Sequence, residues 1–217
     1  MLTILLKVWR KKSMAYYHDL VTQKSWHELQ RLKNLIEFVL IGGWAVYLYT
    51  QSLKSKDIDI IIDFDKLSKL KKNYLVSKND RLKKYEAVKD EVQIDLYLPF
   101  YSHLGIPVEK LTKYTNNVEG FTLLEINHLL VLKLFTLTQR GRTPKGHKDF
   151  IDIIALIQSK MIDWQEVKKI IKDNNLRASI TVFKQFLSEY FEVPELGLNS
   201  HYFSRMKKAI VNELDLN

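Results

Sequence analysis

The sequence predicts an α+β fold, in which a small mixed β-sheet flanked by helices is followed by an α-helical bundle. Two segments, "DIDIIIDF" (57–64) and "EVQIDLYLPF" (91–100), alternate polar and apolar residues, as strands with one buried face do. From Thr122 onward the apolar residues instead recur at helical spacing. Residues 15–35 contain no Gly or Pro and have the same helical spacing, which predicts a helix ahead of the sheet.

Three further segments complete the predicted first half. "EFVLIGG" (37–43) is typical of a short buried strand that ends at its glycines, and "GWAVYLYTQS" (43–52) then predicts a helix that begins directly after them. The stretch from residue 66 to 84 is rich in lysine, which favours a solvated helix and a loop.

The predicted domain boundary lies in residues 101–120, where Gly, Pro and paired Asn interrupt the periodic pattern. It separates a domain of residues 1–105 from a helical domain of residues 106–217. Capping boxes at "TLLE" and "DWQE" predict where two helices of the second domain begin. The expected helices are 123–140, 147–158, 167–175, 179–191 and 201–214.

Composition narrows the possible functions. The formal net charge is +9, which favours an anionic partner such as a nucleotide, RNA or DNA, although lysines that only keep the surface soluble remain the alternative. The absence of cysteine excludes disulfides, zinc thiolate sites and thiol catalysis. No stretch approaches the roughly 18 apolar residues of a membrane span, and the N-terminal "MLTILLKVWRKK" lacks the charge order of a secretory signal. We therefore expect a cytoplasmic protein with no membrane partner.

Asp57 and Asp59 interrupt a row of isoleucines, where a carboxylate has a cost unless it is paired or binds a metal. Strand residues two apart share a face, so the two carboxylates point the same way, with Cα atoms ~6.6 Å apart. Mg²⁺ suits such a pair because it prefers oxygen ligands. Ile58, Ile60, Ile62 and Phe64 are expected to face the core. Asp63 lies too far along the strand to join the cluster and is interpreted as structural or solvent-facing.

Asp95 supplies a third carboxylate on the polar face of "VQIDLYL". If its strand neighbours that of Asp59, three acids converge on one or two metal ions, the geometry used for phosphoryl or nucleotidyl transfer. Asp95 is then both a ligand and a candidate base for the attacking hydroxyl. Taken alone, Asp95 is more typical of a surface acid on an edge strand, and only its place in the set favours the metal-site interpretation.

Gly42 and Gly43 are predicted to lie at a strand-to-helix turn, where a ligand can approach bare backbone and helix amides point toward an anion. A Gly-Gly pair alone is more often a plain tight turn. Coupled to an Asp-x-Asp on the next strand, it indicates a phosphate site beside a metal site.

These motifs together resemble the nucleotidyltransferase superfamily typified by DNA polymerase β. The resemblance covers roughly residues 36–100 and rests on "GGWAV", then "SKDIDI", then "QIDLYL". It implies a nucleotidyltransferase core in which Mg²⁺, one or two ions, is held by the three acids and NMP is transferred from an NTP with release of pyrophosphate. The resemblance also adds Ser55 to the glycines as an NTP-binding residue.

The segment "LLEINHLLVLKLFTLTQRGRTPKGHKDFIDIIALI" resembles the region after the catalytic core in AbiEii-type toxins of toxin–antitoxin pairs. The resemblance assigns NTP binding to Lys133 and Arg140, and a supporting role to Lys148, Asp149 and Asp152.

Lys133 and Arg140 are seven residues apart and so share a helix face, which suits a cationic clamp on the triphosphate. Side chains that snorkel to water, or an ion pair between helices, are the alternatives. On the clamp interpretation, Lys133→Ala weakens NTP binding by about 1.5–3 kcal/mol and barely changes thermal stability.

The leading functional hypothesis is an enzyme that transfers NMP to a hydroxyl of RNA, such as a tRNA end, and that acts as a toxin with a cognate antitoxin. The alternatives are a small-molecule nucleotidyltransferase of the antibiotic-resistance kind and a nucleotide-binding module without turnover. The basic composition argues mildly against a pocket for cationic drugs, and retention of all three acids argues against loss of activity.

Overall fold

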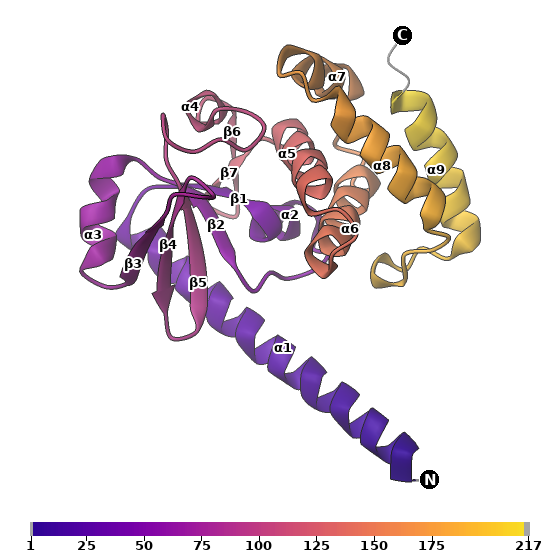
Figure 1. Ribbon diagram of the computed structural model, residues 1–217, viewed down its shortest axis with the longest axis horizontal. Helices are drawn as coiled ribbons and strands as arrows, with labels where there is room; N and C mark the ends of the chain where they lie inside the picture. The colour runs from indigo at the N-terminus through magenta and orange to yellow at the C-terminus, as the bar shows by residue number, and fades with distance from the viewer. Residues whose placement is uncertain (1, 215–217) are drawn as a thin grey trace.

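The computed structural model describes the backbone of residues 2–214 and the side chains of residues 19–214. Its centre is one mixed sheet of seven strands in the order β3-β4-β5-β2-β1-β7-β6, with a group of helices beside it (Figure 1). The predicted α+β fold is therefore confirmed. The strands are β1 (Val39–Ile41), β2 (Ile58–Ile61), β3 (Leu75–Asn79), β4 (Lys84–Lys89), β5 (Val92–Tyr97), β6 (Thr115–Val118) and β7 (Phe121–Leu124).

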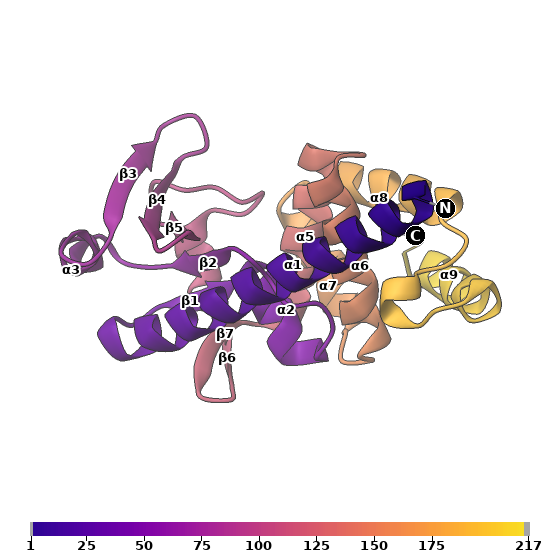
Figure 2. The ribbon, with the colours of Figure 1, turned by 90° about the horizontal axis from the view of Figure 1, so that it is seen from below.

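The helices fall into two groups. Those of the sheet half are α1 (Leu2–Leu35), α2 (Gly42–Thr50), the 3₁₀ turn η1 (Phe64–Lys66), α3 (Leu67–Lys71) and α4 (Val108–Leu111). Those of the helical half are α5 (Ile126–Arg140), α6 (Pro144–Gln158), α7 (Trp164–Asp173), α8 (Arg177–Glu189), the 3₁₀ turn η2 (Pro194–Leu196) and α9 (Ser200–Leu214). Figure 2 views the molecule from below. In this view α1 runs across the front, and the helical half lies to the right of the sheet.

The register of the central strands sets the position of the acids. β2 runs antiparallel to β1, with Ile41 opposite Asp59, and parallel to β5, with Asp59 opposite Asp95. Residues directly opposite each other in a sheet point to the same face, so the two carboxylates are neighbours. Ile58 and Ile60 point to the other face and are fully buried, as the alternation predicts.

Phe64 departs from that alternation. It was expected to face the core, but β2 ends at Ile61 and the chain enters η1, which leaves Phe64 52% exposed. Asp63 is exposed outside the acidic cluster, as expected.

The lysine-rich stretch of residues 66–84 was predicted as a helix plus a loop, and its helix is α3, but the loop part was wrong. After α3 the stretch forms the edge strand β3 and enters β4, which lies between β3 and β5. Few residues of these two strands are buried, so no alternation of apolar residues marks them. The capping box at Thr122 was also wrong. Thr122 lies within β7, and α5 is capped instead by Glu125, whose carboxylate accepts from the N–H groups of Asn127 and His128. The cap at Asp163 is confirmed for α7.

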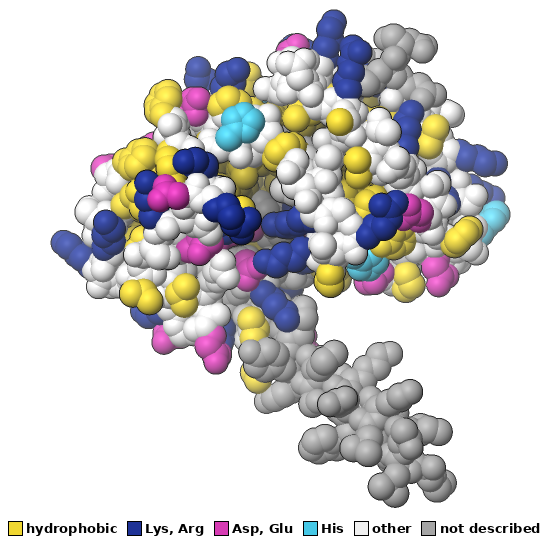
Figure 3. All heavy atoms as spheres, in the orientation of Figure 1, with side chains coloured by type: hydrophobic (Ala, Val, Ile, Leu, Met, Phe, Trp, Pro, Cys, Tyr) yellow, Lys and Arg dark blue, Asp and Glu magenta, His cyan; other side chains and the backbone are white. Residues whose placement is uncertain are grey.

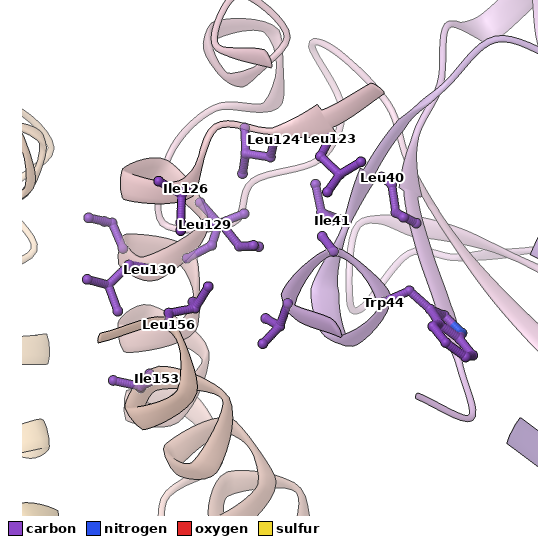
Figure 4. Packing of buried hydrophobic residues seen from close by; sticks show 14 of the residues in the cluster. Leu40, Ile41, Trp44, Leu123, Leu124, Ile126, Leu129, Leu130, Ile153 and Leu156 are labelled. Atoms are coloured by element: carbon purple, nitrogen blue, oxygen red, sulfur yellow. The ribbon is translucent and has the colours of Figure 1, made fainter. Parts of the chain in front are cut away.

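β6 and β7 follow residue 105 in the chain yet complete the sheet, because β7 pairs in parallel with β1. A continuous hydrophobic core joins this edge of the sheet to the helices (Figure 4). Leu40 and Leu123 of the sheet, Trp44 of α2 and Leu129 of α5 all belong to it. The sheet and the helical half thus share one hydrophobic core. Among residues 2–214, no helix has the length and apolar character needed to cross a bilayer.

Candidate active site

A cleft of about 400 Å³ lies between the sheet and the helical half, and a smaller cavity of about 50 Å³ extends it toward α5. Dark-blue Lys and Arg side chains gather in this hollow (Figure 3). The residues that line the cleft or its extension include Gly42, Gly43, Ser55, Asp57, Asp59, Asp95, Lys133, Arg140, Lys148 and Asp149. Asp152 lies behind them as an ion-pair partner of Lys133 and Lys148. The fold therefore brings all the candidate residues to one place.

The two glycines form the floor of the cleft at the start of α2. Gly42 has a φ of +68°, and a Cβ there would lie 2.1 Å from Oδ2 of Asp59, so only glycine fits beside that carboxylate. A Cβ on Gly43 would meet Oγ of Ser55 at 2.7 Å and Nζ of Lys148 at 2.9 Å. No side chain caps the first turn of α2, which leaves its backbone N–H groups available to an anion.

Two of the three acids lie side by side on the sheet. Asp59 and Asp95 are directly opposed on β2 and β5, while Asp57 precedes β2 at the mouth of the cleft. Its Oδ2 lies 3.6 Å from Nζ of the exposed Lys145. As the side chains stand, no three Asp, Glu or His residues in the described part of the chain are close enough together to hold a metal ion. Asp57 and Asp95 are each drawn toward a lysine instead.

Asp59 has the electrostatic signature of a cation site. Burial, and then the neighbouring Asp95, raise the pKa of Asp59 to about 6, against the partial relief that Lys133 and Arg140 supply. Burial and the same two acids also raise the pKa of the Tyr97 hydroxyl well above its ordinary value. This wall of the cleft thus carries negative charge that the protein does not fully neutralise. A hard divalent cation with oxygen ligands, such as Mg²⁺, fits Asp59 and Asp95.

Lys84 is a residue of this site that the sequence analysis missed. It is buried on β4, with Nζ 2.5 Å from Oδ2 of Asp95 and 3.1 Å from Oε1 of Glu86. Nε2 of Gln93 donates to the other oxygen of Asp95 at 3.0 Å. Gln93 lies two residues before Asp95 on one strand, so the alternation was a signal for it. Lys84 had no such signal, because its strand was taken for a loop.

The helical wall of the cleft is a closed ion-pair network. Lys133 is buried, and its Nζ lies 2.9 Å from Asp149 and 2.7 Å from Asp152. Nη1 of Arg140 lies 2.7 Å from the other oxygen of Asp149. Burial alone would lower the pKa of Lys133, but the carboxylates of Asp152 and Asp149 outweigh it and raise that pKa. The network joins α5 to α6, which favours the ion-pair alternative for Lys133 over a lysine free to bind phosphate.

Other cations surround the mouth of the cleft. Lys148 lies 3.1 Å from Asp152 and retains 36% exposure of its side chain, and that of Arg140 is 40% exposed. Lys54, Lys56 and Lys145 line the same cleft. The first two are solvent-exposed, as a turn predicts, yet they form part of the rim. The cleft therefore has acids on the sheet wall and exposed cations around its opening, which suits a polyanion such as a triphosphate.

A family model described as "Nucleotidyltransferase of unknown function (DUF6036)" matches residues 20–195. The chain belongs to this nucleotidyltransferase family. The matched residues include all those that line the cleft, together with the whole sheet. No curated protein matches the chain.

Several solved structures are similar at a low level. JHP933 from Helicobacter pylori is 16% identical, with 89% of this chain and 96% of that chain covered and a TM-score of 0.47. The antibiotic-resistance factor ANT(2'')-Ia is 11% identical, with 78% and 95% covered and a TM-score of 0.48. The Megavirus polyadenylate synthase is 12% identical, with 79% and 43% covered and a TM-score of 0.48. These values are too low to carry an inference about substrate.

Proposed function

We propose that this protein is a Mg²⁺-dependent enzyme that transfers a nucleoside monophosphate from an NTP to a hydroxyl of an RNA acceptor, such as a tRNA end. The observation that carries the proposal is the pairing of Asp59 with Asp95 across from Gly42, at the start of α2. One arrangement thus offers carboxylates for a metal and backbone N–H groups for the phosphates that the metal accompanies.

The residues divide the chemistry between them. Asp59 and Asp95 would hold Mg²⁺, and Asp57 would complete the set if its side chain turned from Lys145 toward them. When bound, the ion would supply positive charge that stabilises the phosphates during transfer. The N–H groups beyond Gly42 and Gly43 hold phosphate oxygens, with Ser55 beside them. Asp95 accepts the proton of the acceptor hydroxyl while the oxygen of that hydroxyl forms a bond to the α-phosphorus. The bond from that phosphorus to the bridging oxygen of the β-phosphate breaks, and pyrophosphate leaves.

In this proposal the cations that bind the triphosphate are the exposed neighbours of Lys133 and not Lys133 itself. Lys133 already has two carboxylate partners, whereas the side chains of Arg140 and Lys148 are each more than a third exposed at the cleft. In this proposal Arg140 and Lys148 contact phosphate oxygens. Lys133, Asp149 and Asp152 hold those two cations in position.

An RNA acceptor is favoured over a cationic small molecule by the charge around the opening. Lys54, Lys56 and Lys145 are exposed there, and they would repel an aminoglycoside-like amine but attract a phosphate backbone. The overall charge of +9 acts in the same direction.

The test is incubation with total RNA, Mg²⁺ and each labelled NTP in turn, followed by separation of the labelled products. We expect one or more NTPs to label RNA, and Asp59→Asn to abolish the labelling. The matched control is Asp63→Asn, which removes an exposed carboxylate outside the cleft and should label RNA normally. Labelling of small molecules but not RNA would reject the RNA acceptor, and equal labelling by both variants would reject the site.

The resemblance to AbiEii-type toxins extends the proposal to a toxin controlled by an antitoxin. If this role is correct, expression of the wild-type protein alone arrests growth and expression of Asp59→Asn does not. Growth arrest by both proteins would separate toxicity from nucleotidyl transfer and reject this extension.

A further inference from the structure

A second cavity, of about 360 Å³, lies away from the acids, between α4, the start of β6 and α7. Tyr114 and His128 form one part of its wall, and Lys110, Lys113 and Lys169 line it as well. None of these residues belongs to the catalytic cleft described above. An aromatic pair surrounded by lysines is a combination that binds nucleic acid in other proteins.

Tyr114 and His128 form a rigid aromatic platform. Their ring centroids are 4.0 Å apart with an interplanar angle of 18°, so the two rings are stacked. His128 is buried, and its Nδ1 lies 2.8 Å from Oε2 of Glu125. The N–H of Glu125 donates in turn to the carbonyl oxygen of Tyr114 at 2.9 Å. Tyr114 is nevertheless 47% exposed, so a base can stack on it without first ordering the ring.

Two exposed lysines beside Tyr114 favour a polyanion at the platform, although the rest of the cavity carries both signs of charge. Lys169 lies 3.5 Å from Glu166, and Asp173 also lines the cavity. Lys110 and Lys113 are exposed and form no ion pair within the described part of the chain, which leaves their charges available to phosphates. Stacking on an exposed aromatic ring beside such lysines recognises single strands, because duplex bases do not offer their faces.

Helix α5 connects this platform to the catalytic cleft. His128, Leu132, Thr136 and Arg140 recur every four residues and so form a stripe that winds by roughly 120° around the helix. The last three line the cavity beside Gly42 and Asp59. At 1.5 Å per residue, the stripe from His128 to Arg140 is ~18 Å long, a span that a few nucleotides of a single strand can cover.

We propose that Tyr114, supported by His128 and flanked by Lys110 and Lys113, binds a base and its adjacent phosphates in a single-stranded part of the RNA acceptor, a few nucleotides from the hydroxyl that reacts. This inference rests on the proposed function and adds to it a subsite remote from the reacting atoms. The subsite stabilises binding of the acceptor without contact with the NTP.

The test is fluorescence anisotropy of labelled single-stranded RNA with the full-length protein and with variants of the platform. Tyr114→Ala should bind an oligonucleotide of about 10 nucleotides about tenfold more weakly, whereas Tyr114→Phe should bind as the wild type does, because a phenyl ring also stacks. Lys113→Gln should reduce the steepness of the plot of log binding constant against log salt concentration by about one. The matched control is Tyr202→Ala, which removes a tyrosine on α9 that is 60% exposed.

Two further measurements locate the effect. An oligonucleotide of about 2 nucleotides is too short to reach both sites, so the wild type should bind the long oligonucleotide more tightly than the short one, and Tyr114→Ala should reduce that difference. NTP affinity and melting temperature should be the same in all the variants.

The outcomes separate this inference from the proposed function. If the wild type labels RNA and Tyr114→Ala binds the long oligonucleotide equally well, the subsite is rejected while the proposed function stands. Weaker binding by Tyr202→Ala to the same extent as Tyr114→Ala would also reject it. If the wild type neither labels nor binds RNA, the RNA acceptor fails and the subsite fails with it.

Discussion

Asp59 and Asp149 are two carboxylates on opposite walls of one cleft, and their environments move their pKa values in opposite directions. On the sheet wall, burial and the nearby Asp95 raise the pKa of Asp59 to about 6. On the helical wall, burial would also raise the pKa of Asp149, but Lys133 and Arg140 outweigh it and lower that pKa. The difference is one of partners, because Asp149 has two cations within 3 Å and Asp59 has none at that distance among the described residues.

This contrast separates two roles that similar residues can have. The helical wall neutralises its own charges, so its network contributes to the packing of α5 on α6. The sheet wall keeps a charge that a bound cation can neutralise, at a cost in stability while no cation is present. We infer that the helical wall is mainly a scaffold and that the sheet wall is the reactive side.

The largest expected effect is on the scaffold. Lys133→Ala should lower the free energy of unfolding by about 3–5 kcal/mol, because it leaves Asp149 and Asp152 buried with less compensation. This reverses the expectation from sequence, in which Lys133 mattered for NTP binding and not for stability. Denaturant titration of the variant, with Lys145→Ala as the exposed control, measures the difference.

The contrast between a scaffold wall and a reactive wall is wrong if Lys133→Ala unfolds at the same denaturant concentration as the wild type but binds NTP more weakly. Lys133 would then be the clamp that its position in an apolar helix first indicated, and the helical wall would be reactive as well.

The sequence predicted the parts of this site that depend on local spacing. Asp57 and Asp59 are two residues apart, Asp95 lies in an alternating strand, and Gly42 follows a short apolar run. Local spacing therefore located each residue, although Asp95 and Gly42 were assigned to the site only in combination with Asp57 and Asp59. The spacing of Asp149 from Asp152 likewise anticipated their role as partners of the α5 cations.

The parts that depend on distant pairing could not be predicted in the same way. Lys84 meets Asp95 only because β4 pairs with β5, and Lys84 ends the lysine-rich stretch that was predicted as a helix and a loop. Thr122 completes a sequence pattern for a helix cap, but pairing of β7 with β1 and β6 overrides it. The stacking of Tyr114 on His128 similarly follows from how β6 meets α5.

A smaller effect of opposite sign is expected on the reactive wall. Asp59→Asn should raise the stability of the metal-free protein by about 1–2 kcal/mol at about pH 8, because it removes a charge that is poorly compensated. The pKa of Asp59 is raised in the folded state from 3.8 to about 6, so the wild type loses stability as pH rises through that window and recovers none above it. Melting curves with a chelator at about pH 8 and about pH 4 should therefore show a gain that disappears in acid. A gain that persists at the lower pH would show that repacking, not charge, is its cause.

The smallest effect concerns Lys84. It lies on the reactive sheet wall, yet it forms ion pairs with neighbouring acids as the cations of the helical wall do. Its ammonium lies 2.5 Å from Oδ2 of Asp95 and so competes with a metal ion for that oxygen. Lys84→Met keeps much of the buried volume while it removes the charge, and we expect it to bind Mg²⁺ in the absence of nucleotide up to about tenfold more tightly, or ~1.4 kcal/mol. Calorimetric titration with Mg²⁺ measures this, and Lys78→Met, which removes an exposed lysine of β3, controls for the change in net charge. Weaker Mg²⁺ binding by Lys84→Met would mean that Lys84 holds Asp95 in place for the metal, and the sheet wall would then contain a scaffold of its own.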